Sequence, residues 1–279
     1  MDPISLSIVM LSALMHAGWN LFVKKDEDKF LSLTLMAATS AVLCALALPL
    51  LPGVNSRAWP ILGVSAILHA GYRICLSLGY KYGEMSQVYP IARGATPLFV
   101  ALASVAMGLS LSAWQYLGIL AIAVGIMGLT FDRGFPTSHA RAAIGFALGT
   151  SAFIATFTLL DSKGARVSGH AYAYILWLFV LEGLLMLMAA LLKSPVRLAR
   201  YAKARGRTCL VNGLVMSAAH ALIIVALSRS QPALVSALRE VSVVFGVIFG
   251  AVFLKESVGF VRMLCTLAVT VGLFFTLLG

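Results

Sequence analysis

The sequence predicts an all-α membrane protein with ten transmembrane helices, arranged as two inverted repeats of five helices. The first observation is composition: of 279 residues, 61% are hydrophobic and 11% charged, and the mean hydropathy is +0.97. Soluble domains have about a quarter of their residues charged, so this chain is not one. The second observation is a series of apolar runs of about 20 residues, the length that crosses a bilayer. The third is an internal repeat.

Ten candidate spans follow one another with little sequence between them. The first half of the chain contains Ser5–Val23, Phe30–Leu51, Pro60–Tyr80, Ser86–Leu109 and Ser112–Phe131. The second half contains Ala142–Asp161, His170–Leu192, Thr208–Ser228, Gln231–Leu254 and Phe260–Leu278. The N-terminal "MDPISLSIVM" has an aspartate and no positive cluster. We therefore interpret the first run as a span, not as a cleaved signal peptide.

The two halves share sequence. "ARGATPLFV" in the fourth span aligns with "LREVSVVFG" in the ninth, in a register that places Arg93 on Arg239 and Phe99 on Phe245. "SALMHAGWNLFVKK" in the first span aligns more weakly with "SAFIATFTLLDSK" in the sixth. Five spans are an odd number of crossings, so the second unit is inverted relative to the first, as in many transporters. We assign residues 1–134 to the first repeat and 135–279 to the second.

The positive charges of the loops predict an orientation. The odd-numbered loops carry fourteen: Lys24, Lys25, Lys29, Lys81, Arg133, Arg141, Lys193, Arg197, Arg200, Lys203, Arg205, Arg207, Lys255 and Arg262. The termini and even-numbered loops carry four: Arg57, Lys163, Arg166 and Arg229. The positive-inside rule therefore predicts odd-numbered loops in the cytoplasm and both termini outside.

Charged residues inside the spans indicate a functional interior. A charge at the bilayer centre costs about 2.5–3.5 kcal/mol, so such residues face one another or a watery cavity. Eight ionisable side chains lie within the spans: Arg73, Arg93, Arg239, Glu182, Glu240, His16, His69 and His220. Three arginines against two glutamates give an excess of positive charge. We expect Glu182 to neutralise one of the arginines.

Helical spacing places several of these groups on common faces. The similar pentapeptides "HAGWN" and "HAGYR" each put a histidine, an aromatic ring and a polar group on one face: His16, Trp19 and Asn20 in the first span, His69, Tyr72 and Arg73 in the third. The fourth span, "YPIARGATP", places Tyr89 and Arg93 together, with Pro90 and Pro97 interrupting its hydrogen-bond ladder. We predict that the two pentapeptide faces line one shared cavity.

The remaining unusual residues are interpreted as packing residues. Cys44, Cys75, Cys209 and Cys265 have no paired spacing, so we assign them neither disulfides nor a metal. "GFALG" (Gly145 and Gly149) and "GVIFG" (Gly246 and Gly250) are small-residue helix faces. Such faces pack helices closely, within this chain or in a homodimer.

These features together resemble the drug/metabolite transporter superfamily, specifically its ten-helix EamA-like branch. "HAGWN…K" closes the first span, "YPIARGATP" lies in the fourth and "REVSVVFGVIFGAVFLKE" in the ninth. The resemblance covers nearly the whole chain and implies a central cavity walled by the third, fourth, eighth and ninth spans. On this chain it implies a substrate site at His69, Tyr72, Arg73, Tyr89, Arg93, His220, Arg239 and Glu240. It also implies both termini in the cytoplasm, against the charge count.

The sequence predicts a secondary active transporter for a small polar metabolite, by alternating access between the two halves. Buried arginines favour an anionic or zwitterionic solute such as an amino acid, organic acid or phosphonate. If protons are coupled, the histidines or Glu240 are the candidate carriers. The chain is expected to work without cofactor, metal or nucleic acid, as a multi-pass protein of the bacterial inner membrane in contact with lipid. Alternatives are an enzyme acting on a lipid carrier, although no HExxH or GxSxG motif is present, and a purely structural subunit.

Overall fold

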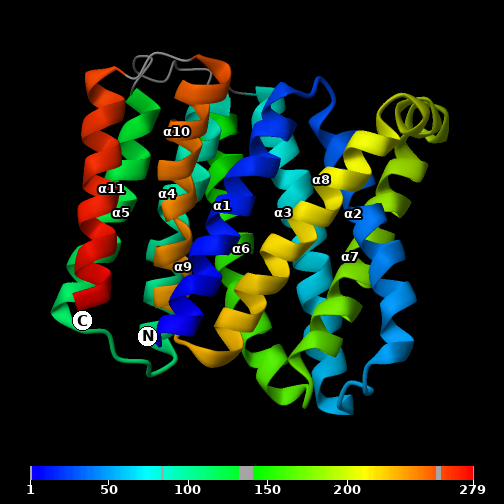
Figure 1. The fold of residues 1–279 in the computed structure, drawn as a ribbon, viewed down its shortest axis with the longest axis horizontal. Coiled ribbons are helices and arrows are strands. Elements are labelled where there is room, and N and C mark those ends of the chain that lie inside the picture. The colour runs from blue at the N-terminus through cyan, green and yellow to red at the C-terminus, as the bar shows by residue number, and fades with distance from the viewer. Residues whose placement is uncertain (1, 83–84, 132–140, 256–258, 279) are drawn as a thin grey trace.

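The computed structural model describes residues 2–82, 85–131, 141–255 and 259–278 (Figure 1). Regular structure in these ranges is entirely helical. The first half comprises α1 (Pro3–Lys25), α2 (Lys29–Ala47), η1 (Leu48–Leu50), η2 (Ser56–Ala58), α3 (Trp59–Tyr82), α4 (Met85–Ala106), α5 (Ala113–Gly128) and η3 (Leu129–Phe131). The second half comprises α6 (Arg141–Val167), α7 (Ala171–Lys193), α8 (Pro195–Arg229), α9 (Pro232–Arg239), α10 (Val241–Leu254) and α11 (Phe260–Leu278).

The predicted fold class is confirmed. Among the described residues, nine helical segments are long and apolar enough to cross a membrane. The fifth span is shorter, because α5 has 16 residues, but η3 continues it to Phe131. The predicted repeat boundary between residues 134 and 135, and Arg133 of the loop count, lie outside the described residues.

Three predicted spans differ from the observed helices. The sixth predicted span ends at Asp161, but α6 continues to Val167. In this extension Arg166 donates to the carbonyls of Leu227 and of Ser230, the residue after α8. The eighth was expected to begin at Thr208, but α8 begins at Pro195. The cause is an N-terminal cap, since the Ser194 hydroxyl accepts the backbone N–H of Arg197. The basic residues of this segment therefore lie on a helix and not in a loop.

The ninth predicted span, Gln231–Leu254, is two helices. α9 ends at Arg239, and α10 begins at Val241. Glu240 is the junction, and its backbone N–H donates to the carbonyl of Ala237. Neither proline nor glycine stands at this point of the sequence, so local propensity gives no sign of the break. Discontinuous spans of this kind recur at transporter binding sites.

Helix packing follows the two-fold relation between inverted repeats. α3 packs against α6 as α8 packs against α1, and α4 packs against α6 as α10 packs against α1. The equivalent helices of the two halves meet each other at both ends of the bundle, α5 with α11 and α2 with α7 (Figure 1). The middle of the bundle is therefore built from α1, α3, α4, α6, α8 and α9. The predicted site residues lie on all of these helices except α6, with Glu240 directly after α9.

Glycines allow close contacts between these helices, as between α5 and α11. A Cβ added at Gly118 would lie 2.6 Å from the carbonyl oxygen of Gly272. Of the small-residue faces singled out in the sequence, Gly149 meets Cys75 of α3. Gly145 and Gly246 have no atom within 4 Å of an added Cβ. Their predicted role in a homodimer stays a prediction.

We expect Gly118→Ala to destabilise the protein by about 1–3 kcal/mol, because two helix backbones would be forced apart. The matched control is Gly145→Ala, which adds the same methyl group on an exposed helix face. It should be neutral or stabilising by up to about 1 kcal/mol through helix propensity. Thermal unfolding in detergent measures both. Equal melting temperatures for the two variants would show that α5 and α11 do not pack closely.

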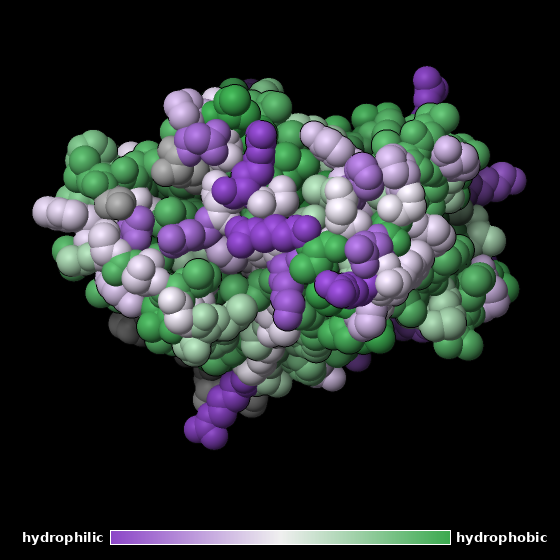
Figure 2. Space-filling model, turned by 90° about the horizontal axis from the view of Figure 1, so that it is seen from below, coloured by the Kyte–Doolittle hydropathy of each residue, from purple (hydrophilic) through white to green (hydrophobic). Residues whose placement is uncertain are grey.

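The two chain ends lie on the same face of the molecule (Figure 1). Seen from that side, hydrophilic residues gather over the middle of the face and hydrophobic residues surround them (Figure 2). Large apolar side chains on the outer helices are exposed, including Leu46 at 72% and Phe274 at 60%. A hydrophobic perimeter of this kind is what a lipid environment stabilises.

The prediction that this face is outside the cytoplasm can be tested with reporters at the C-terminus. Alkaline phosphatase fused there should be active and a fluorescent protein fused there should be dark, because the face carries four of the eighteen loop cations. A fluorescent, phosphatase-negative C-terminus would place both ends in the cytoplasm instead.

Candidate functional site

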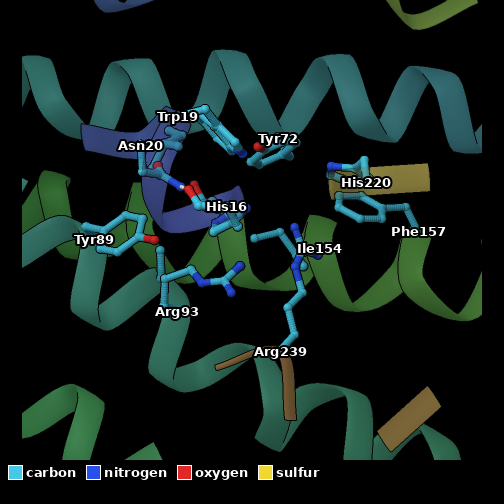
Figure 3. Close-up of a pocket in the computed structure, with 13 residues that line it drawn as sticks. His16, Trp19, Asn20, Tyr72, Tyr89, Arg93, Ile154, Phe157, His220 and Arg239 are labelled. Atoms are coloured by element: carbon cyan, nitrogen blue, oxygen red, sulfur yellow. Dashed lines mark hydrogen bonds between the residues drawn. The ribbon is translucent and has the colours of Figure 1, made fainter. Parts of the chain in front are cut away.

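A cavity in the middle of the bundle collects most of the predicted site residues. Its empty volume, counted together with the solvent space open to it, is about 400 Å³. Eight of the eleven predicted residues line it: His16, Trp19, Asn20, Tyr72, Tyr89, Arg93, His220 and Arg239. Figure 3 shows the side chains of Arg93 and Arg239 directed into the same space from different helices. All three residues of the first-span face line this cavity, whereas of the third-span face only Tyr72 does.

Arg93 has an acidic partner across the repeat interface. It lies on α4 and is 4% exposed. Its Nε donates to Glu240 Oε2 at 3.1 Å, and its Nη2 lies 2.8 Å from Glu240 Oε1. The Nη2 atom nevertheless lacks the alignment of a hydrogen bond. The pair joins the first repeat to the junction between α9 and α10, so Arg93 has a structural role besides facing the cavity.

Arg239, the repeat equivalent of Arg93, has no such partner. It is 6% exposed and stands at the end of α9. Its Nε is buried without a hydrogen-bond acceptor. In the described part of the chain, no carboxylate lies within 4.0 Å of its guanidinium. An unpaired buried guanidinium is costly to the protein unless a ligand or water satisfies it.

The opposite wall of the cavity comes from α1. His16 and Trp19 meet edge to face, with ring centroids 4.8 Å apart. Asn20 donates to the carbonyl of His16 at 2.8 Å (Figure 3). Trp19 Nε1 is buried and has no acceptor. This wall therefore adds a second unused donor to that of Arg239.

The fourth span continues through its prolines, since α4 contains both Pro90 and Pro97. The predicted interruption affects hydrogen bonds and not the course of the helix. Pro97 has no N–H to give to the carbonyl of Arg93, four residues before it. The carbonyl of the preceding residue, Ala92, accepts the hydroxyls of Thr96 and Ser151 at 2.8 and 2.7 Å. Hydroxyl groups thus add to the backbone hydrogen bonds beside Arg93.

Three predicted site residues lie outside the lining of this cavity. Glu240 is turned to Arg93 and lines a smaller adjoining cavity. Arg73 donates through Nε to Glu182 Oε1 on α7, so Glu182 neutralises an arginine as expected. His69 is 0% exposed and stacks on Phe157, with ring centroids 3.7 Å apart. Arg73 and His69 belong to a separate polar cluster behind the cavity wall.

Asp161 is a buried acid that the sequence pattern does not reveal. The sixth predicted span ends at Asp161, whereas the structure places this residue within α6, where it is 1% exposed. It accepts hydrogen bonds from Ser65 at 2.5 Å and Tyr174 at 2.9 Å. The polar stretch that begins with Asp161, "DSKGAR", resembles a loop and gives no sign that the helix continues. The cavity-lining residues Leu76, Ala92, Thr150, Ile154 and Phe157 were also missed; apolar ones carry no signal in an apolar chain.

Asp161 also changes the charge balance inside the spans. Three arginines now face three carboxylates, so the excess of positive charge expected for the whole interior is absent. The excess is local. Arg73 pairs with Glu182 and Arg93 with Glu240, while Asp161 lies beside His69. The cavity itself, with Arg93, Arg239 and Glu240 at its edge, keeps one positive charge.

Cysteines at Trp19 and Tyr72 test the shared cavity. After the four native cysteines are replaced, each should react with a small aqueous thiol reagent, because both positions line the cavity. The control is Leu62→Cys, on the same helix as Tyr72 but 0% exposed in the apolar core. Reaction of Trp19→Cys and Tyr72→Cys at no more than the Leu62→Cys rate would place these faces in dry packing.

Comparisons with known proteins agree with this architecture. The EamA-like transporter family matches the chain twice, over residues 3–131 and 141–278. No curated protein matches the chain. A solved structure titled only "Crystal structure of protein" is similar over 100% of this chain and 98% of its own, with a TM-score of 0.79 and 16% identity; this likeness concerns the fold alone. The two family matches coincide with the two five-span halves. The chain therefore belongs to the EamA-like transporter family, and it is a membrane transporter of the drug/metabolite superfamily.

Proposed function

We propose that this transporter moves a small anionic or zwitterionic metabolite, such as an amino acid, an organic acid or a phosphonate. The observation that carries the proposal is the unpaired guanidinium of Arg239 in the central cavity. A planar guanidinium binds carboxylate or phosphonate oxygens through two parallel hydrogen bonds. A solute with such a group would satisfy Arg239 and neutralise the local positive charge.

The other unused donor supports the same class of solute. Trp19 Nε1, on the opposite wall, is also buried without a hydrogen-bond partner. An indole N–H can donate a hydrogen bond but cannot accept one. Donors on two sides favour a solute rich in acceptors. Tyr72, Phe157 and Trp19 give the cavity aromatic surfaces, which suit the small apolar part of a metabolite.

Transport by this protein would be driven by a gradient or by exchange. The sequence contains no GxxxxGK[ST] nucleotide-binding loop. The cavity lies between the two inverted halves, and its walls come from both. Rocking of one half against the other would expose it to each side in turn. Membership of a transporter family does not favour the alternative of an enzyme acting on a lipid carrier.

Uptake of labelled solutes into proteoliposomes tests the proposal. The panel should contain an amino acid (alanine), an organic acid (succinate), a phosphonate (2-aminoethylphosphonate) and a cation (choline). We expect saturable uptake of at least one of the first three and none of choline. Protein-free liposomes give the leak rate. Saturable choline uptake, without uptake of any anion or zwitterion, would contradict the proposed solute class.

A further inference from the structure

Behind the cavity wall lies a second group of ionisable side chains, which the solute site does not use. His69 on α3 stands between two carboxylates, Asp161 on α6 and Glu182 on α7. Its Nε2 lies 2.9 Å from Asp161 Oδ2, and its Nδ1 lies 3.8 Å from Glu182 Oε2. The side chains of all three are at most 3% exposed. Arg73 completes the group by donating to Glu182.

The hydrogen bonds of Asp161 fix how His69 is oriented. Oδ1 of Asp161 accepts the hydroxyls of Ser65 and Tyr174. Oδ2 then accepts the Nε2–H of His69, because an ionised carboxylate can only accept. In a neutral imidazole the remaining nitrogen, Nδ1, is itself an acceptor. It is buried, has no hydrogen-bond partner, and faces an oxygen of Glu182.

A proton on Nδ1 would remove this conflict. An acceptor facing an acceptor is unfavourable, whereas an Nδ1–H faces Glu182 Oε2 favourably. Charge counting gives the same result. Asp161 and Glu182 contribute two negative charges and Arg73 one positive charge, so a neutral His69 leaves the buried group with one uncompensated charge. One added proton makes it neutral, which a buried site strongly favours.

Among the described residues, three rings surround His69. From α3 it meets Tyr72, and from α8 it meets His220, whose ring centroid is 5.3 Å away. Phe157 of α6 covers one face of its ring. Arg73 holds Glu182, and its positive charge disfavours a metal cation in the same place. In the described part of the chain, no three His, Cys, Asp or Glu side chains are arranged to hold a metal ion.

The wall between this group and the solute cavity is one side chain thick. Tyr72, Phe157 and His220 contact His69 and also line the cavity. A proton on His69 therefore makes the potential in the cavity more positive, which favours a bound anion. By thermodynamic reciprocity, a bound anion favours the proton equally. Each ligand would stabilise the protein form that carries the other.

We propose that His69, held between Asp161 and Glu182, is the proton-binding site that couples transport to the proton gradient. This inference rests on the proposed transport function. A proton from water binds Nδ1 on one side of the membrane and returns to water from Nδ1 on the other, with no other bond made or broken. Since proton and anion favour each other, both travel in the same direction.

Two measurements test this site, and the first needs no solute. Nitrogen-15 NMR of histidine-labelled protein in detergent at neutral pH should show one buried imidazolium, with both ring nitrogens protonated. The signal should vanish in His69→Gln and persist in His170→Gln, an exposed histidine at the start of α7. Asp161→Asn keeps the shape and removes one negative charge, so His69 should become neutral there. If His69→Gln does not fold, Asp161→Asn provides the test instead. A neutral His69 in the native protein would overturn the proposal.

The second measurement uses proteoliposomes that contain a pH-sensitive dye and receive the solute panel above. Uptake of the transported solute should acidify the interior, and an inward proton gradient should accelerate uptake by about ten-fold, the scale of a typical coupling energy. His69→Gln and Asp161→Asn should lose this acceleration, and His170→Gln should keep it. Solute uptake that follows a sodium gradient, or moves no protons, would overturn the coupling site. If no panel solute is transported, the proposed function fails, while the NMR result still decides the proton site.

Discussion

Replacing Arg239 by glutamine is expected to reduce uptake of the anionic solute by about a hundred-fold. Two charge-assisted hydrogen bonds from one guanidinium contribute together about 3 kcal/mol, and each 1.4 kcal/mol is a factor of ten. The loss should appear in solute uptake and not in stability. Arg239 makes no ion pair among the described residues, so its removal leaves no buried carboxylate without its partner.

Arg239→Lys separates charge from geometry. The lysine keeps the positive charge but loses the planar fork, so uptake should fall by about ten-fold, less than with glutamine. Arg57→Gln, which removes an exposed arginine before α3, is the matched control and should transport normally. The readouts are uptake into proteoliposomes and the melting temperature in detergent. Normal uptake by Arg239→Gln would exclude Arg239 from solute binding; a melting temperature that falls in step with uptake would make it a structural residue.

The sequence predicted the fold well because the bilayer restricts the choices. Every span must be apolar and about 20 residues long, and every buried charge must find a partner or a cavity. These two requirements located the ten spans and most of the cavity-lining residues. The repeat alignment pairs Arg93 with Arg239, and these residues lie on α4 and α9, one in each half.

The sequence did not reveal which buried charges pair with which. Arg93 and Arg239 look alike in an alignment, yet only Arg93 reaches Glu240 in an ion pair. Pairing depends on side-chain direction and on the break between α9 and α10, and neither leaves a local sequence signal. Asp161 was missed for a related reason. Its partners Ser65 and His69 come from a helix more than 90 residues away in sequence, and its own neighbours resemble a loop.

Arg93→Ala is expected to destabilise the protein by roughly 3–5 kcal/mol, the usual cost of breaking a buried ion pair. An arginine that only bound solute could be removed without loss of stability. Arg93 is instead paired with a Glu240 that is 1% exposed. Without Arg93, the carboxylate of Glu240 is buried without its partner.

The double variant Arg93→Met/Glu240→Gln decides whether the cost comes from the stranded charge. It removes both charges and keeps similar side-chain volumes, so it should recover most of the melting temperature lost by Arg93→Ala, while transport stays impaired. Arg197→Ala is the control, since it breaks an ion pair with Asp28 in which Arg197 is 63% exposed. Solvent screens that pair, so its loss should cost less than about 1 kcal/mol. If the double variant is no more stable than Arg93→Ala, the arginine stabilises the bundle through its packing, and Glu240 is not its energetic partner.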